Sequence, residues 1–307
     1  MEQKLKKKSF MKTLKKDGAL HLMMALPVII LFVFHYIPLF GVTIAFQKYN
    51  PAMGFSKSLF VGLENFKTLF STPGFLQSVE NTISIAIGKL ILGIIVPVTF
   101  ALLLNEMGSS RIKRSIQTIV YLPHFVSWVL MAGIIIEILN PRNGLVNEFL
   151  GLFGARPIFF LGSNRLFRGV IWTTDIWKEF GYSTIIYMAA LTGIDPALYE
   201  AASLDGAGHI RKMWNVTLPG IKSTILLLTI LKIGSIMNAG FDQIYNLYSP
   251  ITYEAGDIID TLVYRLGLGG GQFSLATAAG LFKSAISGAL LVVSYKVAYK
   301  VSGYRVF

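Results

Sequence analysis

Residues Glu200–Pro219 read EAASLDGAGHIRKMWNVTLP and form a polar, helix-favouring insert in a chain whose other long segments are mostly apolar. Asp195 and Pro196, just before it, are a favourable helix start, with Asp as the N-cap and Pro at the first helical position. Asp205 and Gly206 are a turn signal. We therefore expect two short helices that join near Gly206 and gain stability by docking on another molecule. Periodicity alone would favour an ordinary amphipathic loop at a membrane surface.

The composition is that of an integral membrane protein. Of the 307 residues, 53% are hydrophobic and 14% are charged, whereas a soluble domain carries about 25% charged residues. The mean hydropathy is +0.60. The net charge of +12 does not indicate nucleic-acid binding, because the lysines gather at the edges of apolar segments. The chain has no cysteine, and its four histidines lack the spacing of a metal site, so we expect no disulfide and no bound metal.

Six apolar segments reach the roughly 20 residues that a bilayer requires. They are Leu20–Phe46, Val79–Asn105, Ser115–Leu139, Phe167–Ile194, Leu218–Met237 and Ala276–Tyr299. We expect an all-α integral membrane protein, with a basic cytoplasmic segment at residues 1–19 and a six-helix transmembrane domain at residues 20–307. Pro27 and Pro38 are expected to kink the first span. In the last span Gly280, Ser284 and Gly288 form a small-residue stripe that suits close packing within the chain or against another subunit.

The distribution of Lys and Arg predicts the orientation. Residues 1–19 carry seven lysines, and the short link Glu106–Arg114 carries three further basic residues. Both termini and the loop at residues 195–219 are therefore expected in the cytoplasm of a multi-pass cell-membrane protein. The connections expected to face outward are Gln47–Ser78, Asn140–Leu166 and Asn238–Leu275.

The sequence predicts neither an enzyme nor a nucleotide-binding protein. Residues 268–272, LGGGQ, resemble the signature of an ABC ATPase, but the chain has no G-x-x-x-x-G-K-[ST] loop to hold phosphates. We recognise no Ser/His/Asp arrangement, acid–base carboxylate pair or HExxH motif. The expectation is that this chain has no catalytic residues and binds no cofactor.

The insert carries a resemblance to a known family. The matching residues of the EAA signature, E-A-A-x3-G-x9-I-x-L-P, are Glu200, Ala201, Ala202, Gly206, Leu218 and Pro219. Val216 stands where the signature has Ile, while Trp214 and the run Asp205–Ala207 match the fuller form seen in sugar permeases. The chain thus resembles the permease subunits of binding-protein-dependent type I ABC importers. It is most similar to maltose-type carbohydrate permeases, particularly the polysaccharide and oligosaccharide permeases of Gram-positive bacteria.

This resemblance implies a function and a set of partners. The chain would move an oligosaccharide by alternating access, together with a second, similar permease subunit in the lipid bilayer. Two cytoplasmic ATPase subunits would bind ATP and Mg²⁺, and an extracellular solute-binding protein would deliver the substrate. The coupling residues implied at the ATPase contact are Glu200, Ala201, Ala202, Asp205, Gly206, Ala207, Leu218 and Pro219.

Polar and aromatic residues in the outer half of the fourth span and at the outer end of the fifth form a candidate substrate cavity, although aromatic residues near an interface are often only membrane anchors. The candidates are Trp172, Asp175, Trp177, Lys178, Tyr182, Asn238, Phe241 and Gln243, with Tyr245 nearby. Asp175, Lys178 and Glu179 also suit local ion pairing on one helix. Lysines outnumber carboxylates within the spans, which favours an acidic oligosaccharide. A secondary transporter or channel without an ATPase, or a membrane scaffold, would also fit six spans but not the EAA signature.

Overall fold

The computed structural model describes residues 18–302. The predicted basic segment at residues 1–19 therefore lies almost entirely outside the described residues. From the first helix to the fourth predicted span the elements are α2 (Gly18–Leu31), η1 (Phe32–Tyr36), η2 (Ile37–Phe46), β1 (Gln47–Lys48), α3 (Gly54–Lys57), β2 (Leu59–Phe60), α4 (Glu64–Ser71), α5 (Phe75–Asn105), α6 (Ser110–Tyr121), η3 (Leu122–Phe125), α7 (Trp128–Ile138), α8 (Leu145–Gly151), η4 (Phe160–Gly162) and α9 (Asn164–Thr192). The remaining elements are α10 (Pro196–Leu204), α11 (His209–Lys212), η5 (Met213–Thr217), α12 (Leu218–Gly220), α13 (Lys222–Gly234), α14 (Phe241–Leu247), η6 (Pro250–Thr252), α15 (Tyr253–Gly256), α16 (Ile259–Tyr264), η7 (Arg265–Gly269) and α17 (Phe273–Ser302).

All six predicted spans fall on helices, but not all are simple membrane-crossing rods. Gly18–Phe46, Phe75–Asn105 and Phe273–Lys296 are long and apolar enough to cross a membrane by themselves. Two further spans are bent pairs, α6–η3 with α7 at 105° and α11–α12 with α13 at 56°. Helix α9 is long enough to cross a membrane, but it carries too many charged residues to count as an apolar span. The helical class is confirmed, and the count of six crossings stays a prediction.

The breaks in the bent segments have local causes. In the first span, α2 passes through Pro27 without a break, whereas Pro38 lies where a π-helical turn gives way to a 3-10 helix. In the third, Pro123 tightens the chain into η3, and Ser127 then caps α7 by accepting from the Leu130 N–H at 3.4 Å. The helix type thus changes at Pro38 and not at Pro27, and the kinks expected at the two prolines stay predictions.

The core of the bundle is the contact between α5 and α9. Trp172 of α9 lies against Gly88 of α5, where an added Cβ would come within 2.3 Å of the indole. The indole N–H donates to the Ile85 carbonyl at 3.1 Å. Further along the same pair, Tyr187 and Ala101 are fully buried in an apolar cluster. A glycine on one helix and a large aromatic on the other therefore bring the two backbones close together.

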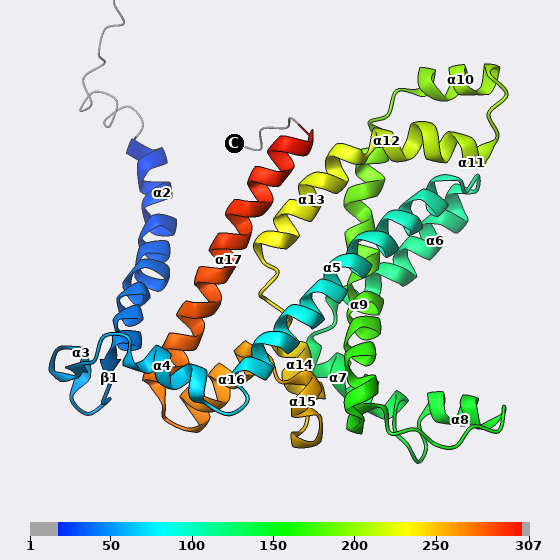
Figure 1. The fold of residues 1–307 in the computed structure, drawn as a ribbon. Coiled ribbons are helices and arrows are strands. Elements are labelled where there is room, and N and C mark those ends of the chain that lie inside the picture. Colours follow the sequence, from blue (N-terminus) through cyan, green and yellow to red (C-terminus); the bar gives the residue numbers. More distant parts are fainter. Residues whose placement is uncertain (1–17, 303–307) are drawn as a thin grey trace, which may run out of the picture.

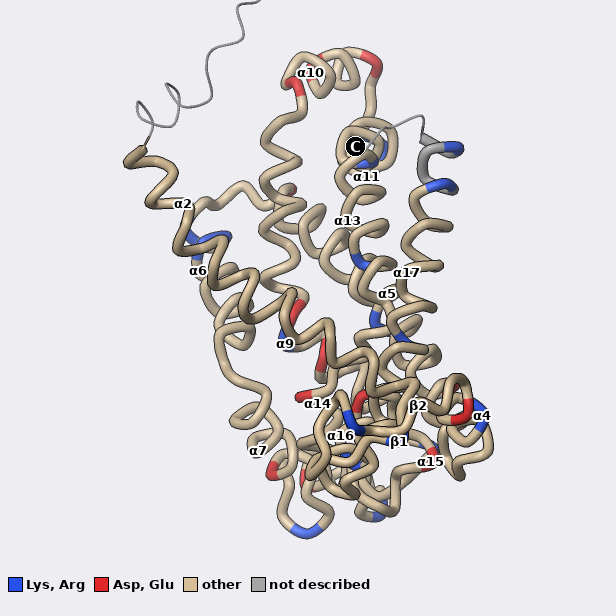
Figure 2. Tube along the Cα trace, turned by 90° about the vertical axis from the view of Figure 1, so that its left-hand side faces the viewer, with Lys and Arg blue, Asp and Glu red and all other residues tan. Residues whose placement is uncertain are grey.

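Different elements form the two ends of the molecule. Helices α10, α11 and α12 lie at one end, together with the start of α2 and the end of α17, while α4, α8, α15 and α16 lie at the other (Figure 1). Most charged residues also lie toward the two ends, with a few along the middle of the bundle (Figure 2). This arrangement is what the predicted orientation requires, because it puts the described ends of the chain on the same side as the EAA insert.

The first helix and the last helix both present uncovered surface. Helix α2 stands apart from the bundle (Figure 1), and none of its residues is buried. Of the residues in η2, which packs against α17, Ala45 is buried. On α17, an added Cβ at Gly280 or Gly288 would meet nothing within 4 Å among the described residues. The small-residue stripe is therefore not used for close packing within the described part of this chain.

An ion pair holds the short helices at the end opposite the EAA insert. Asp257 is 4% exposed, and its carboxylate accepts from both terminal nitrogens of Arg265, at 3.0 and 2.6 Å. The guanidinium also lies over the Tyr253 ring, 4.5 Å from its centroid. The hydrogen bond and the charge of Asp257 raise the pKa of Arg265, so the guanidinium stays protonated.

We expect Arg265→Ala to lower the thermal unfolding temperature of the purified protein, because it leaves a buried carboxylate without its cation. Breaking a buried pair costs about 3–5 kcal/mol. Since one third of the arginine side chain is exposed, we expect a smaller loss of about 2 kcal/mol. Thermal denaturation in detergent measures it, with the exposed Arg156→Ala as the control. Equal unfolding temperatures for the two variants would contradict this role of the pair.

Candidate coupling loop and polar pocket

The EAA insert folds as a helical hairpin. The Asp195 carboxylate accepts from the Ala197 N–H at 2.9 Å and Pro196 begins α10, so the predicted helix start is confirmed. The chain then turns at Gly206, which has a φ of +72°. The Ala207 N–H donates to the Ala202 carbonyl at 2.9 Å, which satisfies a carbonyl at the end of α10. A positive φ is easily adopted only by glycine, so the turn depends on Gly206.

The second helix of the hairpin differs from the prediction. It begins at His209 and continues through the π-helical turn η5 to Gly220, and the bend into α13 comes at Ile221. Leu218 and Pro219 therefore lie within the helix and not at the start of the next span. Pro219 lies just after the π-helical segment, two residues before the bend at Ile221.

Side chains tie the two helices of the hairpin together and to the bundle. The Tyr199 hydroxyl donates to Thr217 Oγ1 at 3.1 Å, and Lys212 Nζ donates to Ser203 Oγ at 2.7 Å. His209 Nδ1 lies 2.8 Å from a carboxylate oxygen of Glu106 at the end of α5. Movement of the hairpin is thus linked directly to the second span.

The hairpin exposes most of the residues implied at the ATPase contact. The exposed ones are Glu200, Ala201, Asp205, Gly206 and Pro219, whereas Ala202, Ala207 and Leu218 are half-buried. The same surface carries exposed apolar side chains, led by Leu204 at 91%. Leu198, Ile210 and Trp214 are exposed as well, and several exposed apolar side chains rimmed by polar residues are typical of a docking surface. The role of these residues stays a prediction.

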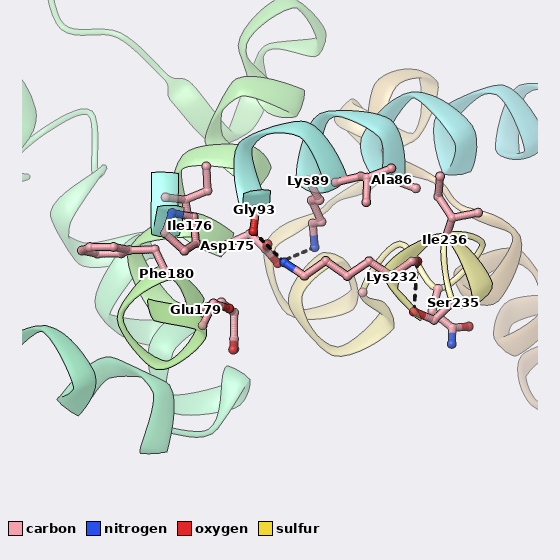
Figure 3. Close-up of a pocket in the computed structure, with 15 residues that line it drawn as sticks. Ala86, Lys89, Gly93, Asp175, Ile176, Glu179, Phe180, Lys232, Ser235 and Ile236 are labelled. Atoms are coloured by element: carbon pink, nitrogen blue, oxygen red, sulfur yellow. Dashed lines mark hydrogen bonds and ion pairs between the residues drawn. The ribbon is translucent and has the colours of Figure 1, made fainter. Parts of the chain in front are cut away.

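A polar pocket of about 290 Å³ lies between α5, α9, α13 and the segment that follows α13 (Figure 3). Its charged and polar lining residues are Lys89, Asp175, Glu179, Ser183, Lys232, Ser235 and Asn238. Ionisable groups within membrane helices are costly and usually face a cavity or a partner. A pocket that gathers four of them is therefore the main candidate for a site of function.

Lys89 of α5 is the centre of one network in this pocket. Its ammonium lies 2.8 Å from the Asp175 carboxylate and donates to the side-chain oxygen of Gln243. Gln243 is fully buried, and its amide donates to the Ile171 carbonyl and to Thr174 Oγ1, both at 2.8 Å. The network joins α5, α9 and α14 through groups that are all hydrogen-bonded, as buried polar groups require.

Glu179 belongs to a second network behind the pocket. Its two oxygens meet His124 Nδ1 at 2.7 Å and Lys178 Nζ at 3.1 Å. Lys178 also donates to the His124 carbonyl at 2.7 Å, and the His124 ring stacks on Tyr182 with centroids 4.0 Å apart. These contacts hold α9 to the bent connection η3. The expected local pairing is found between Lys178 and Glu179, while Asp175 pairs instead with Lys89.

The structure divides the eight predicted cavity residues among several places. Asp175 and Asn238 line the polar pocket, and Gln243 contacts it through Lys89. Trp172 is used in the α5–α9 contact, and Lys178 and Tyr182 surround His124. Trp177 and Phe241 line two separate, mainly apolar pockets. Trp172 and Asp175, three residues apart on one face of α9, both contact α5, at Ile85 and Lys89, whereas Glu179 and Lys178 contact His124.

The eight predicted cavity residues did not include three ionisable residues of the pocket, Lys89, Glu179 and Lys232. Their signal was present in the sequence, since each is an ionisable group inside a predicted span. No group of three or more potential metal ligands occurs among residues 18–302, and the pocket offers an ionic and amide lining suited to a polar solute.

A helical bundle with a polar pocket and an exposed hairpin at one end is the architecture that a membrane permease needs. Residues 89–305 match the family described as "Binding-protein-dependent transport system inner membrane component", and the chain belongs to this family. It is a membrane component of a transport system and not an enzyme.

Two curated relatives and two solved structures resemble nearly the whole chain. It is 42% identical to the "Polygalacturonan/rhamnogalacturonan transport system permease protein YteP" of Bacillus subtilis (strain 168), over 97% of this chain and 93% of that protein. It is 41% identical to "Protein LplB" of the same organism, over 95% and 92%.

The similar structures are of a bacterial ABC transporter involved in the import of the acidic polysaccharide alginate. One has 36% sequence identity and a TM-score of 0.88 and covers 95% of this chain and 98% of that chain. The other, in complex with alginate pentasaccharide-bound periplasmic protein, has 35% identity and a TM-score of 0.89, with coverage of 97% and 100%. The fold of this chain is that of an ABC importer permease.

Proposed function

We propose that this chain is the permease subunit that moves an acidic oligosaccharide across the cell membrane by alternating access. The polar pocket carries the proposal, because it places two lysines and two carboxylates in the middle of an otherwise apolar bundle. The similar proteins favour an acidic sugar, since their names state polygalacturonan and alginate. The pocket would hold part of the oligosaccharide while the surrounding helices expose it first to one side and then to the other.

The energy for transport would come from other chains. This chain has no phosphate-binding loop, so two cytoplasmic ATPase subunits would bind and hydrolyse ATP. A second permease subunit would complete the membrane part, with both termini of this chain in the cytoplasm. The exposed hairpin of α10 and α11 supports docking on the ATPase, because its contacts with Glu106 can pass a displacement into α5. The solved neighbour in complex with a substrate-bound periplasmic protein supports delivery by a solute-binding protein.

Transport by the complete complex in proteoliposomes tests this function. The complex contains this chain, the second permease, the ATPase and the solute-binding protein, and the substrates are labelled oligogalacturonides. We expect uptake that requires ATP and the binding protein and that vanadate inhibits. Uptake that continues without ATP and stops when an ion gradient is collapsed would instead establish a secondary transporter. ATP hydrolysis that no oligosaccharide stimulates, without any uptake, would indicate a scaffold.

A further inference from the structure

We propose that Lys232 binds a carboxylate of the substrate and thereby gives the pocket its preference for acidic sugars. This inference rests on the proposed function, since it names the residue that recognises the acidic class. It starts from the lysines of the membrane helices, most of which are already neutralised by partners within the chain.

Lysines that are paired within the bundle cannot supply free positive charge. Lys89 lies 2.8 Å from Asp175, Lys178 lies 3.1 Å from Glu179, and Lys283 lies 2.6 Å from Asp260. Lys178 also points away from the pocket, toward the His124 carbonyl. Of the lysines within the spans, these three are therefore not candidates for binding the substrate carboxylate.

Lys232 differs from these three residues. It lines the pocket, and its Nζ donates to the Gly93 carbonyl at 2.6 Å (Figure 3). Within residues 18–302, no Asp or Glu oxygen lies within the 4.0 Å that defines an ion pair with this nitrogen. A lysine ammonium has three N–H donors, and one carbonyl does not use them all. Lys232 thus brings to the pocket a positive charge without a direct counter-ion.

The pocket wall is shaped around this ammonium. At Gly93, an added Cβ would lie 3.0 Å from Lys232 Nζ, so the glycine leaves the lysine room to approach the α5 backbone. The carbonyl anchors the ammonium from α5, while its remaining donors are available to a solute in the pocket. The anchored position reduces the entropy that a flexible lysine would lose on binding.

The neighbouring charges do not cancel this site. The pocket also contains Asp175 and Glu179, but each carboxylate already has a cation, Lys89 for the first and Lys178 for the second. A sugar carboxylate that enters the pocket therefore meets two compensated pairs and one uncompensated ammonium. A hydrogen bond between ionised partners is roughly twice as strong as a bond between neutral partners. A neutral sugar of the same shape cannot form the stronger bond with Lys232.

A matched pair of substrates tests the proposal directly. We would measure ATP-dependent uptake by the reconstituted complex of a trigalacturonide and of the same trisaccharide with its carboxyl groups reduced to neutral alcohols. The variants are Lys232→Met, which keeps the length but has no donor, and Lys232→Gln, which keeps a donor without the charge. Lys222→Met, at the exposed start of the same helix, is the control.

We expect wild type to prefer the trigalacturonide and both Lys232 variants to lose that preference. Their uptake of the acidic sugar should fall by roughly tenfold to a hundredfold, the effect of removing one hydrogen bond to a charged group, and their uptake of the neutral sugar should fall by much less. Lys222→Met should take up both sugars like wild type. If Lys232→Met lowers both sugars equally and Lys232→Gln restores both, the residue only ties α13 to α5 and the proposal is overturned. Unchanged acidic uptake in the Lys232 variants would also overturn it. Failure of wild type to import either sugar would instead reject the proposed function itself.

Discussion

Gly206→Pro is expected to abolish ATP-driven uptake while leaving membrane insertion intact. Gly206 has a φ of +72°, and proline fixes φ near −65°. The substitution also removes the N–H that donates to the Ser203 carbonyl at 3.1 Å. The turn between α10 and α11 must then rearrange, and the exposed face of the hairpin changes shape. We expect uptake to fall at least tenfold, and Gly206→Ala, which costs roughly 1–2 kcal/mol in a left-handed conformation, to fall less.

The matched control for this loss is Gly208→Ala. Gly208 lies two residues further along the same turn, but its φ of −71° is open to any residue, and an added Cβ would meet nothing within 4 Å. We therefore expect wild-type uptake from Gly208→Ala. The measurements are the amount of protein in the membrane fraction, co-purification of the ATPase, and ATP-dependent uptake. If Gly206→Pro protein transports at the wild-type rate, the proposal that this hairpin docks on the ATPase is wrong.

The hairpin also shows how far the sequence could predict the fold. Asp195 and Pro196 act locally, through a cap and a fixed φ, and they place the start of α10 as predicted. The length of the second helix was not predictable in the same way. Its π-helical turn at Met213–Thr217 carries the chain through Pro219 into a bend at Ile221. That path depends on tertiary contacts such as Tyr199 with Thr217, which no local pattern contains.

The pocket was predictable in its residue types but not in its pairings. Charged residues inside apolar segments marked Lys89, Asp175 and Lys232 as groups with a partner or a cavity. Which carboxylate meets which lysine depends on how α5, α9 and α13 cross, and sequence spacing carries no information about that. Asp175 therefore pairs across the bundle with Lys89 and not with Lys178 on its own helix. The bend of 105° in the third span was equally unpredictable, because hydropathy identifies an apolar segment but not its direction.

The crossing of α9 with α6 should be at least as sensitive as the hairpin. At Gly181 of α9, an added Cβ would lie 2.2 Å from the Val120 carbonyl oxygen and 2.8 Å from a Val120 side-chain carbon. Because the nearest atoms belong to a backbone, no side-chain rotation can relieve the clash. Gly181→Ala must therefore push the two helices apart. Overpacking costs about 1–3 kcal/mol and occasionally more, and here we expect the upper end of that range.

The separation of these helices should also reach the pocket. Glu179, two residues before Gly181, contacts His124, which follows Val120 in the chain, and that carboxylate-to-imidazole distance is 2.7 Å. We therefore expect Gly181→Ala to lower both the thermal unfolding temperature in detergent and the uptake of oligogalacturonides by the complex. Gly169→Ala is the control, because it lies on the same helix with nothing within 4 Å of the added Cβ. If both variants unfold and transport like wild type, then α9 and α6 do not cross as closely as this structure shows. The proposed link from the bend at His124 to the pocket would then be wrong as well.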